Sequence, residues 1–408
     1  MVDTKTIAIL ATLDTKGDEA DYLREQLAQL GSRALVFDMG VMGTPAAEVD
    51  VTRDEIAIAG GTPLAELLSA PTREKSAPVM IAGAMKILRE KVKSGEVDGV
   101  LGLGGFQGTS ACTQVMRALP YGVPKVMVST AASGDTASYV DIMDITMMFS
   151  VGDILGLNSF TRKILANAAG AAHGMAQVEV TFETGNSDKP LIGMSNLGVL
   201  TKGALTALEL FAERGYEVVV FHAIGSGGRA MEQMMKEGII GAVFDYAMGE
   251  IADEVFGVLR AGGPERLTVA GELGIPQVLC PGGSEHLGIL VEPNVVPDEW
   301  KDHTYVFHSP VVFVPRLNAE EFVRVAEDIT KRLQHTQGNA VMMLPMDGTG
   351  SYAKPGGDLR DTDSDAAFFK ALKQGLGDRM EIVERATHAE DPAFVKECVE
   401  RLIELIES

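Results

Sequence analysis

The chain has few basic residues, and this shortage argues against nucleic acid as a partner. Its 408 residues include 35 Lys and Arg against 57 Asp and Glu, which gives a formal net charge of −22 at pH 7. The basic residues are mostly scattered, so no basic field is available to displace the counterions of a phosphate backbone. An anionic ligand must therefore be held by backbone N–H groups, a few placed cations or a metal.

Cysteines and long apolar runs are also scarce. Cys112, Cys280 and Cys398 lie far apart and match no zinc or redox spacing, so we expect buried thiols in a reducing compartment. No apolar run is long enough to cross a bilayer, and the N-terminus does not resemble a signal peptide. No nucleophile elbow and no His-Glu-x-x-His pattern occurs. We expect a cytoplasmic protein without a membrane partner.

What the chain does have is a glycine-rich stretch, LGLGGFQGTS at residues 101–110, between a strand-like run and a helix-like segment at 111–119. Glycines at such a turn let backbone N–H groups approach an anion, which then faces the positive end of the helix dipole. The spacing is one residue longer than the dinucleotide fingerprint, and no Gly-Lys dipeptide of a Walker A loop is present. We predict a phosphate or carboxylate site, and the alternative is a turn whose glycines only allow close packing. The predicted contacts are Gly104, Gly105, Gln107, Gly108, Thr109 and Ser110.

An internal repeat organises the chain. A strand and loop at residues 6–17 have a counterpart at 190–203, and each is followed by an amphipathic helix, a glycine and a second strand. Short apolar strands separated by helical segments favour parallel sheets covered on both faces. We therefore predict an α/β fold of two tandem Rossmann-like, doubly wound domains, residues 1–184 and 185–408. We place the ligand cleft between them, at the carboxyl ends of the strands.

Loops after the strands of the first domain supply further candidate contacts. Lys16 and Gly17 follow the first strand, and a cation there is not needed to cap a helix, so Lys16 is a candidate phosphate contact. Asp38 ends the second strand, where an acidic residue would meet a ribose hydroxyl or would simply form a turn. A hydroxyl-rich loop after residues 126–128 suits either a phosphate or an exposed turn. Its candidates are Thr130, Ser133 and Gly134.

The second domain offers two more glycine loops. Residues 225–229 follow a strand and begin a helix, and residues 281–286 follow another strand. The predicted ligand contacts in these loops are Gly227, Gly228, Arg229, Gly282 and Gly283. The candidate catalytic residues are Glu250, Glu285 and His286, because a carboxylate and an imidazole serve acid–base chemistry. The alternatives are a solvated helix start for Glu250 and a structural role for His286.

Three segments closely resemble the Tm-one-like ATP-binding family: LDTKGDE at 13–19, FDMG at 37–40 and GGFQGTS at 104–110. The resemblance extends over essentially the whole chain, including residues 129–134 and 281–283. This family is bacterial and fungal, and in plants it forms the N-terminal inhibitory domain of a tobamovirus-resistance protein. The resemblance implies two Rossmann-like subdomains, ATP with Mg²⁺ bound between them, and a homodimer.

We therefore expect an ATP-binding protein that acts as an ATP-dependent enzyme on a small anionic metabolite in the cleft between its domains. The alternative is a nucleotide-gated binding or regulatory protein without catalysis. The absence of the dinucleotide-binding glycine fingerprint counts against a dehydrogenase-like or nucleotide-sugar enzyme. Neither the residues nor the resemblance identifies the metal ligands or the substrate.

Overall fold

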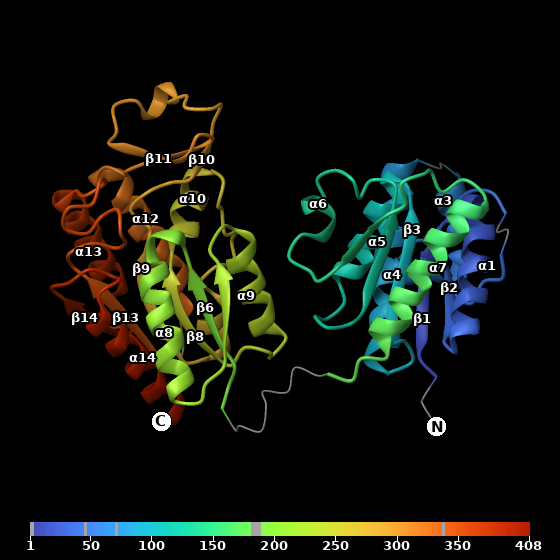
Figure 1. Ribbon diagram of the computed structural model, residues 1–408, viewed down its shortest axis with the longest axis horizontal. Helices are drawn as coiled ribbons and strands as arrows, with labels where there is room; N and C mark the ends of the chain where they lie inside the picture. The colour runs from blue at the N-terminus through green and yellow to red at the C-terminus, as the bar shows by residue number, and fades with distance from the viewer. Residues whose placement is uncertain (1–3, 45–46, 70–71, 181–188, 337–338) are drawn as a thin grey trace. The chain divides into compact units, whose positions relative to one another are not determined.

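The computed structural model describes residues 4–44, 47–69, 72–180, 189–336 and 339–408, which belong to two compact α/β units. The described part of the first unit ends at residue 180, and that of the second begins at residue 189 (Figure 1). Each unit is built on a parallel sheet, so the predicted fold class is confirmed. The predicted boundary at residues 184–185 lies outside the described residues.

The first unit contains a five-stranded parallel sheet in the order β2-β1-β3-β4-β5. Its strands are β1 (Thr6–Ala11), β2 (Arg33–Asp38), β3 (Gly99–Gly104), β4 (Lys125–Ser129) and β5 (Thr146–Phe149). Every residue of β1 and β3 is buried, as expected where helices cover both faces of a parallel sheet. The chain runs from β1 outward to β2 and then returns to β3 on the other side of β1. The carboxyl ends of β1 and β3 therefore form the topological switch point, where open α/β sheets bind ligands.

Alternate residues of β1 belong to two separate hydrophobic clusters. Ile7 and Ile9 pack beneath α1 (Leu13–Leu30) and α7 (Ser159–Ala176), whereas Ala8 and Leu10 pack beneath the helices of the opposite face. The helices of that opposite face are α2 (Arg53–Ala59), α4 (Arg73–Lys93) and α5 (Phe106–Arg117). Two short helices, α3 (Leu64–Ser69) and α6 (Ala137–Val140), complete the unit.

Local sequence explains where several of these helices begin and end. Thr52 caps α2 in a capping box with Glu55, and Asn158 caps α7 in the same way with Thr161. Helix α1 ends at Gly31, whose φ of 91° is the left-handed conformation that glycine adopts without strain.

The second unit repeats the same strand order with one strand added. Its six-stranded parallel sheet has the order β14-β13-β9-β8-β6-β7, so β7, β6, β8, β9 and β13 correspond to β2, β1, β3, β4 and β5. Its strands are β6 (Ile192–Asn196), β7 (Val218–His222), β8 (Ala242–Ala247), β9 (Gln277–Gly282), β13 (Ala340–Pro345) and β14 (Glu381–Arg385). The shared order agrees with the internal repeat found in the sequence.

Helices cover both faces of the second sheet (Figure 1). They are α8 (Thr201–Glu213), α9 (Ser226–Lys236), α10 (Gly249–Phe256), α11 (Val269–Leu273), α12 (Ala319–Arg332), α13 (Thr362–Leu376) and α14 (Pro392–Glu407), with single 3₁₀ turns at Gly198–Leu200, Asp298–Trp300 and Leu333–His335. A small antiparallel sheet of β10 (Ile289–Leu290), β12 (Val312–Pro315) and β11 (Tyr305–Ser309) was not expected from the sequence. In the described part of the chain, no helix is both long and apolar enough to span a bilayer.

Candidate functional site

The first unit contains a cavity of about 370 Å³ at the carboxyl edge of its sheet, beside the switch point between β1 and β3. Four stretches of chain line it. Residues of the 11–15 segment span the end of β1 and the start of α1, residues 39–42 follow β2, and Leu103 is the last residue but one of β3, beside the first turns of α5. The remaining wall comes from the start of α4, where Thr72, Ser76 and Met80 recur at a spacing of four.

The cavity has an apolar floor and an open rim. Met39, Met80, Leu103 and Cys112 are buried at its floor, whereas Thr15, Met42, Ala77 and Gln107 are exposed around its mouth. Burial raises the pKa of the Cys112 thiol to about 12, so this group is a neutral, apolar part of the floor. A mainly apolar pocket with a few polar groups at one side is typical of sites for small organic ligands.

The glycine-rich stretch enters this cavity, but as a helix start and not as a loop. Strand β3 runs to Gly104 and α5 begins at Phe106, so only Gly105 separates them, whereas the sequence suggested a helix from residue 111. Gly104 makes this tight connection possible, because a Cβ there would lie 2.8 Å from the Cα of Gly108. Gly105 has room for a Cβ, 3.6 Å from the Thr130 Oγ1. The packing interpretation therefore explains Gly104 but not Gly105.

The N-terminus of α5 carries backbone donors that the helix itself does not use. The first bond of the helix runs from the Thr109 N–H to the Gly105 carbonyl at 2.8 Å, so the N–H groups of residues 106–108 have no partner within the helix. Gly105 provides no side chain to cap them. Gln107 and Gly108 line the cavity, so these donors and the positive end of the helix dipole lie beside it.

Other predicted contacts in the glycine-rich stretch are structural. Thr109 is fully buried, and its hydroxyl lies 2.6 Å from that of Ser129. Ser110 accepts a hydrogen bond from the side chain of Gln114 at 3.2 Å. The predicted hydroxyl-rich loop follows β4 as expected, but none of Thr130, Ser133 and Gly134 lines the cavity.

Asp38 holds the wall of the cavity together and offers no free oxygen to a ribose. It is fully buried; its Oδ1 accepts hydrogen bonds from the N–H groups of Leu13 (3.2 Å) and Gly40 (2.9 Å). Its Oδ2 accepts from the Nε of Arg53 at 2.7 Å, and the same guanidinium donates to the carbonyls of Met42 and Gly43 at 3.0 Å. Asp38 and Arg53 thereby fix the loop after β2.

Lys16 lies at a kink in the first turns of α1, where its φ of −129° and ψ of 20° are not helical, and Gly17 follows it. The Lys16 Nζ donates a hydrogen bond to the carbonyl of Ile154, and neither residue lines the cavity. The described lining contains one charged residue, Asp14, and no lysine or arginine. Across the described residues, no group of three or more His, Cys, Asp or Glu side chains is arranged to hold a metal ion.

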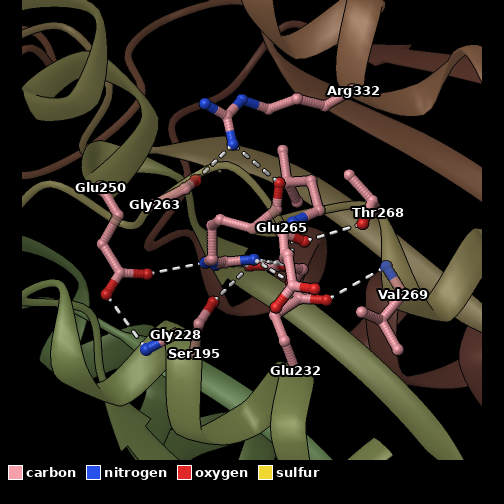
Figure 2. Close-up of polar contacts among 12 residues, drawn as sticks. Ser195, Gly228, Glu232, Glu250, Gly263, Glu265, Thr268, Val269 and Arg332 are labelled. Atoms are coloured by element: carbon pink, nitrogen blue, oxygen red, sulfur yellow. Dashed lines mark hydrogen bonds and ion pairs between the residues drawn. The ribbon is translucent and has the colours of Figure 1, made fainter. Parts of the chain in front are cut away.

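The second unit contains a buried ionic cluster that accounts for Glu250. Arg266 is fully buried and donates two hydrogen bonds to the carboxylate of Asp245, at 2.5 and 2.6 Å, in a bidentate pair. Its Nε donates to the Oε2 of Glu250 at 2.7 Å. A third carboxylate, Glu232, lies 3.3 Å from the same guanidinium. Figure 2 shows Glu250 beside Gly228, and Glu232 beside Val269.

Glu250 occupies the anion position of the second glycine loop. Its Oε1 accepts hydrogen bonds from the N–H groups of Gly225 at 2.6 Å and Gly228 at 3.0 Å, at the start of α9. A Cβ at Gly228 would lie 2.0 Å from the Glu250 Oε2, and one at Gly227 would lie 1.9 Å from the His222 carbonyl. The loop is an anion site, as the sequence suggested, but the anion is the chain's own carboxylate. Arg229 follows in the first turn of α9.

Burial and the charges of this cluster shift the pKa values of Glu232 and Arg266. Burial raises the pKa of Glu232 to about 7, although Arg266 and the N–H groups of Leu267 and Val269 act in the opposite direction. Burial alone would lower the pKa of Arg266, but Asp245, Glu250 and Glu232 raise it well above its usual range.

The predicted Glu285–His286 pair exists and is buried. The Nδ1 of His286 lies 3.0 Å from the Glu285 Oε1, and the Thr349 hydroxyl donates to the other carboxylate oxygen at 2.7 Å. Arg260 donates to the Nε2 of His286 at 3.3 Å, which indicates that Nδ1 carries the imidazole proton. Burial raises the pKa of Glu285, but His286, Arg316 and Thr349 together lower it to about 2. His286 is only 3% exposed.

Gly282 and Gly283 allow the chain to turn tightly before this pair. A Cβ at Gly282 would lie 2.3 Å from the Tyr246 carbonyl, and Gly283 has a φ of 65°, in the left-handed region. The Gly283 N–H donates to the carbonyl of Thr349 at 2.9 Å. Both glycines therefore have a structural reason to be present.

Two family models match the chain in the same two parts that the structure separates. They are the N-terminal domain of an uncharacterised protein family (UPF0261), over residues 5–181, and the C-terminal domain of the same family, over residues 189–406. The chain belongs to the UPF0261 family. A family member from Clostridium tetani is 37% identical over 404 residues, covering 99% of each chain. Another, from Rhizobium meliloti, is 34% identical over 397 residues, covering 97% of this chain and 98% of the relative.

The predicted resemblance to the tomato resistance protein is confirmed as sequence similarity over 75% of the chain, and the match itself says nothing of ATP. The tomato protein "ToMV resistance protein Tm-1(GCR237)" is 32% identical over 312 residues, which is 75% of this chain and 41% of the tomato protein. Among solved structures, a UDP-N-acetylglucosamine 2-epimerase from Rickettsia bellii covers 98% of this chain and 96% of its own, with 11% identity and a TM-score of 0.21. A likeness this weak carries no argument about function.

Reasoning from the sequence missed the α4 wall of the cavity. Thr72, Ser76 and Met80 lie on one face of the helix, as do Ala77 and Ile81, because each set is spaced by four residues. That spacing is visible in the sequence. The assignment of this face to a cavity depends on α4 packing beside α5, which the sequence does not reveal.

Proposed function

We propose that this protein binds a nucleotide, ATP in particular, in the cavity of its first unit, with the phosphates on the N-terminus of α5. The observation that supports this most is that unsatisfied N–H groups of an uncapped helix start lie beside an apolar cavity at the switch point of the sheet. The apolar floor suits a base and the helix start suits phosphates.

The charge of the cavity favours a nucleotide that arrives with Mg²⁺. The described lining has no lysine or arginine to balance a triphosphate, and its one charged side chain is the carboxylate of Asp14. Mg²⁺ is commonly held by one or two carboxylates, the phosphates of its nucleotide and several waters. Asp14 is the residue that would hold it, since no larger ligand cluster is found in the described residues. Affinity for ATP should therefore depend on Mg²⁺, and Asp14→Asn should weaken that dependence.

A second candidate function is an ATP-dependent enzyme acting on a small anionic metabolite. The observation in its favour is the Glu285–His286 pair, a buried carboxylate and imidazole in direct contact after the carboxyl end of β9. Glu250 does not support it, because the N–H groups of Gly225 and Gly228 and the guanidinium of Arg266 hold it as a structural anion. Turnover that His286→Ala abolishes, with ATP affinity retained, would support the enzyme over a purely nucleotide-gated binding protein.

Calorimetric titration of the full chain with ATP, with and without Mg²⁺, tests the proposal. Ala77 is an exposed wall residue, so Ala77→Trp should fill the cavity mouth and abolish binding without disturbing the core. Ala82 is exposed on the same helix but outside the lining, so Ala82→Trp is the matched control and should bind as the unaltered protein does. Equal binding by both variants, or binding by neither the variants nor the unaltered protein, would contradict the proposal.

A further inference from the structure

One polar atom in the floor of the cavity has no explanation in the fold. Ser76 is 6% exposed, and its Oγ is buried with no hydrogen-bond partner among the described residues. Its backbone N–H donates to the Thr72 carbonyl at 3.0 Å, so the helix itself is regular at this point. Buried hydroxyls are nearly always paired, because an unpaired one loses its hydration without compensation.

Three other polar side chains of the cavity lining have a contact within the protein. The hydroxyls of Thr12 and Thr15 lie 3.2 Å apart, and the Cys112 thiol lies 3.5 Å from the Leu10 carbonyl. Ser76 therefore places an unpaired hydroxyl beside the apolar side chains of Met39, Met80 and Leu103 in the cavity floor. A hydroxyl is both a donor and an acceptor, so it can pair with either kind of ligand atom.

We propose that Ser76 is a specificity-determining residue that hydrogen-bonds the exocyclic group of the bound nucleobase. This inference rests on the proposed function. The phosphates take the start of α5 at one side, so the base occupies the apolar floor, and its exocyclic amine is the polar group farthest from the phosphates. A base that lacks this group leaves the Ser76 hydroxyl unpaired, and such mismatches are the strongest basis for discrimination between similar ligands.

The test compares two ligands and two proteins. Calorimetry measures the affinity of the unaltered protein and of Ser76→Ala for Mg-ATP and for Mg-purine riboside triphosphate, which lacks the 6-amino group. The unaltered protein should prefer ATP by about three- to tenfold, the range expected for one hydrogen bond. Ser76→Ala should lose that factor for ATP and bind both ligands alike, so the two changes are not additive.

A measurement on the ligand-free protein distinguishes a role of Ser76 in ligand specificity from a structural role. Removing an unpaired buried hydroxyl should leave the ligand-free protein at least as stable as before, measured by the calorimetric melting temperature. A lower melting temperature for Ser76→Ala, or an equal loss of affinity for both ligands, would overturn the assignment of Ser76 while leaving nucleotide binding intact. Absence of ATP binding in the unaltered protein would overturn both this inference and the proposed function.

Discussion

Replacement of Glu250 by alanine should destabilise the second unit strongly. The substitution removes the acceptor of three donors, namely the N–H groups of Gly225 and Gly228 and the Nε of Arg266, in a place with no exposure to water. Breaking a buried ion pair by removing one partner costs about 3–5 kcal/mol. If urea lowers the stability by roughly 3 kcal/mol per M, the midpoint should fall by about 1–1.7 M.

The chain offers a convenient probe for this experiment. Its single tryptophan is Trp300, which is 9% exposed and lies in the second unit, so intrinsic fluorescence reports the unfolding of that unit. Glu272→Ala is the matched control, because Glu272 is an exposed glutamate of α11 and surface substitutions usually change stability by less than about 0.5 kcal/mol. A Glu250→Ala midpoint equal to that of the control would refute the structural role and restore Glu250 as a catalytic candidate.

Three further changes test other parts of the account. The pKa of Glu232 is raised from its ordinary 4.5 to about 7, so between these pH values the folded protein keeps a proton that the unfolded chain has lost. The resulting contribution to the free energy of unfolding is complete below about pH 4.5 and is lost as the pH rises to 7. Glu232→Gln should therefore flatten the pH dependence of Trp300-monitored unfolding between pH 5 and 7 by up to about 1.4 kcal/mol per pH unit, and an unchanged slope would refute the shift. Gly104→Ala should destabilise the first unit by about 1–3 kcal/mol in calorimetric melting, because its Cβ would meet the backbone at 2.8 Å, whereas Gly105→Ala should fold normally. Asp38→Asn should lower both the melting temperature of the first unit and the ATP affinity, by loosening the cavity wall; a loss of affinity alone would favour a ribose contact.

Much of the fold was predictable from the sequence because it depends on local patterns. The strand predicted within residues 6–17 is present as β1 at Thr6–Ala11, and its predicted counterpart within residues 190–203 is present as β6 at Ile192–Asn196. The small sheet of β10, β11 and β12 was missed; β10 has only two residues and pairs with β12 across a long irregular connection, whereas β11 and β12 are joined by a short turn.

The roles of individual site residues were harder to predict, because they depend on distant partners. Glu250 looked like a free carboxylate, yet its donors lie 16 to 25 residues away in the chain. Asp38 looked like a ribose ligand, yet Arg53 neutralises it from the next helix. The glycine stretch was correctly singled out, but its helix begins five residues earlier than expected because Gly104 lets the strand and helix pack closely.

The most direct test of nucleotide binding is hydrogen–deuterium exchange of the full chain with and without Mg-ATP. The first-turn amides of α5, at residues 106–108, have no partner within the helix, whereas Glu250 already occupies the N–H groups of Gly225 and Gly228 at α9. ATP should slow exchange in a peptide covering residues 103–110 and leave one covering residues 223–230 unchanged. Protection at 223–230 without protection at 103–110 would contradict the account.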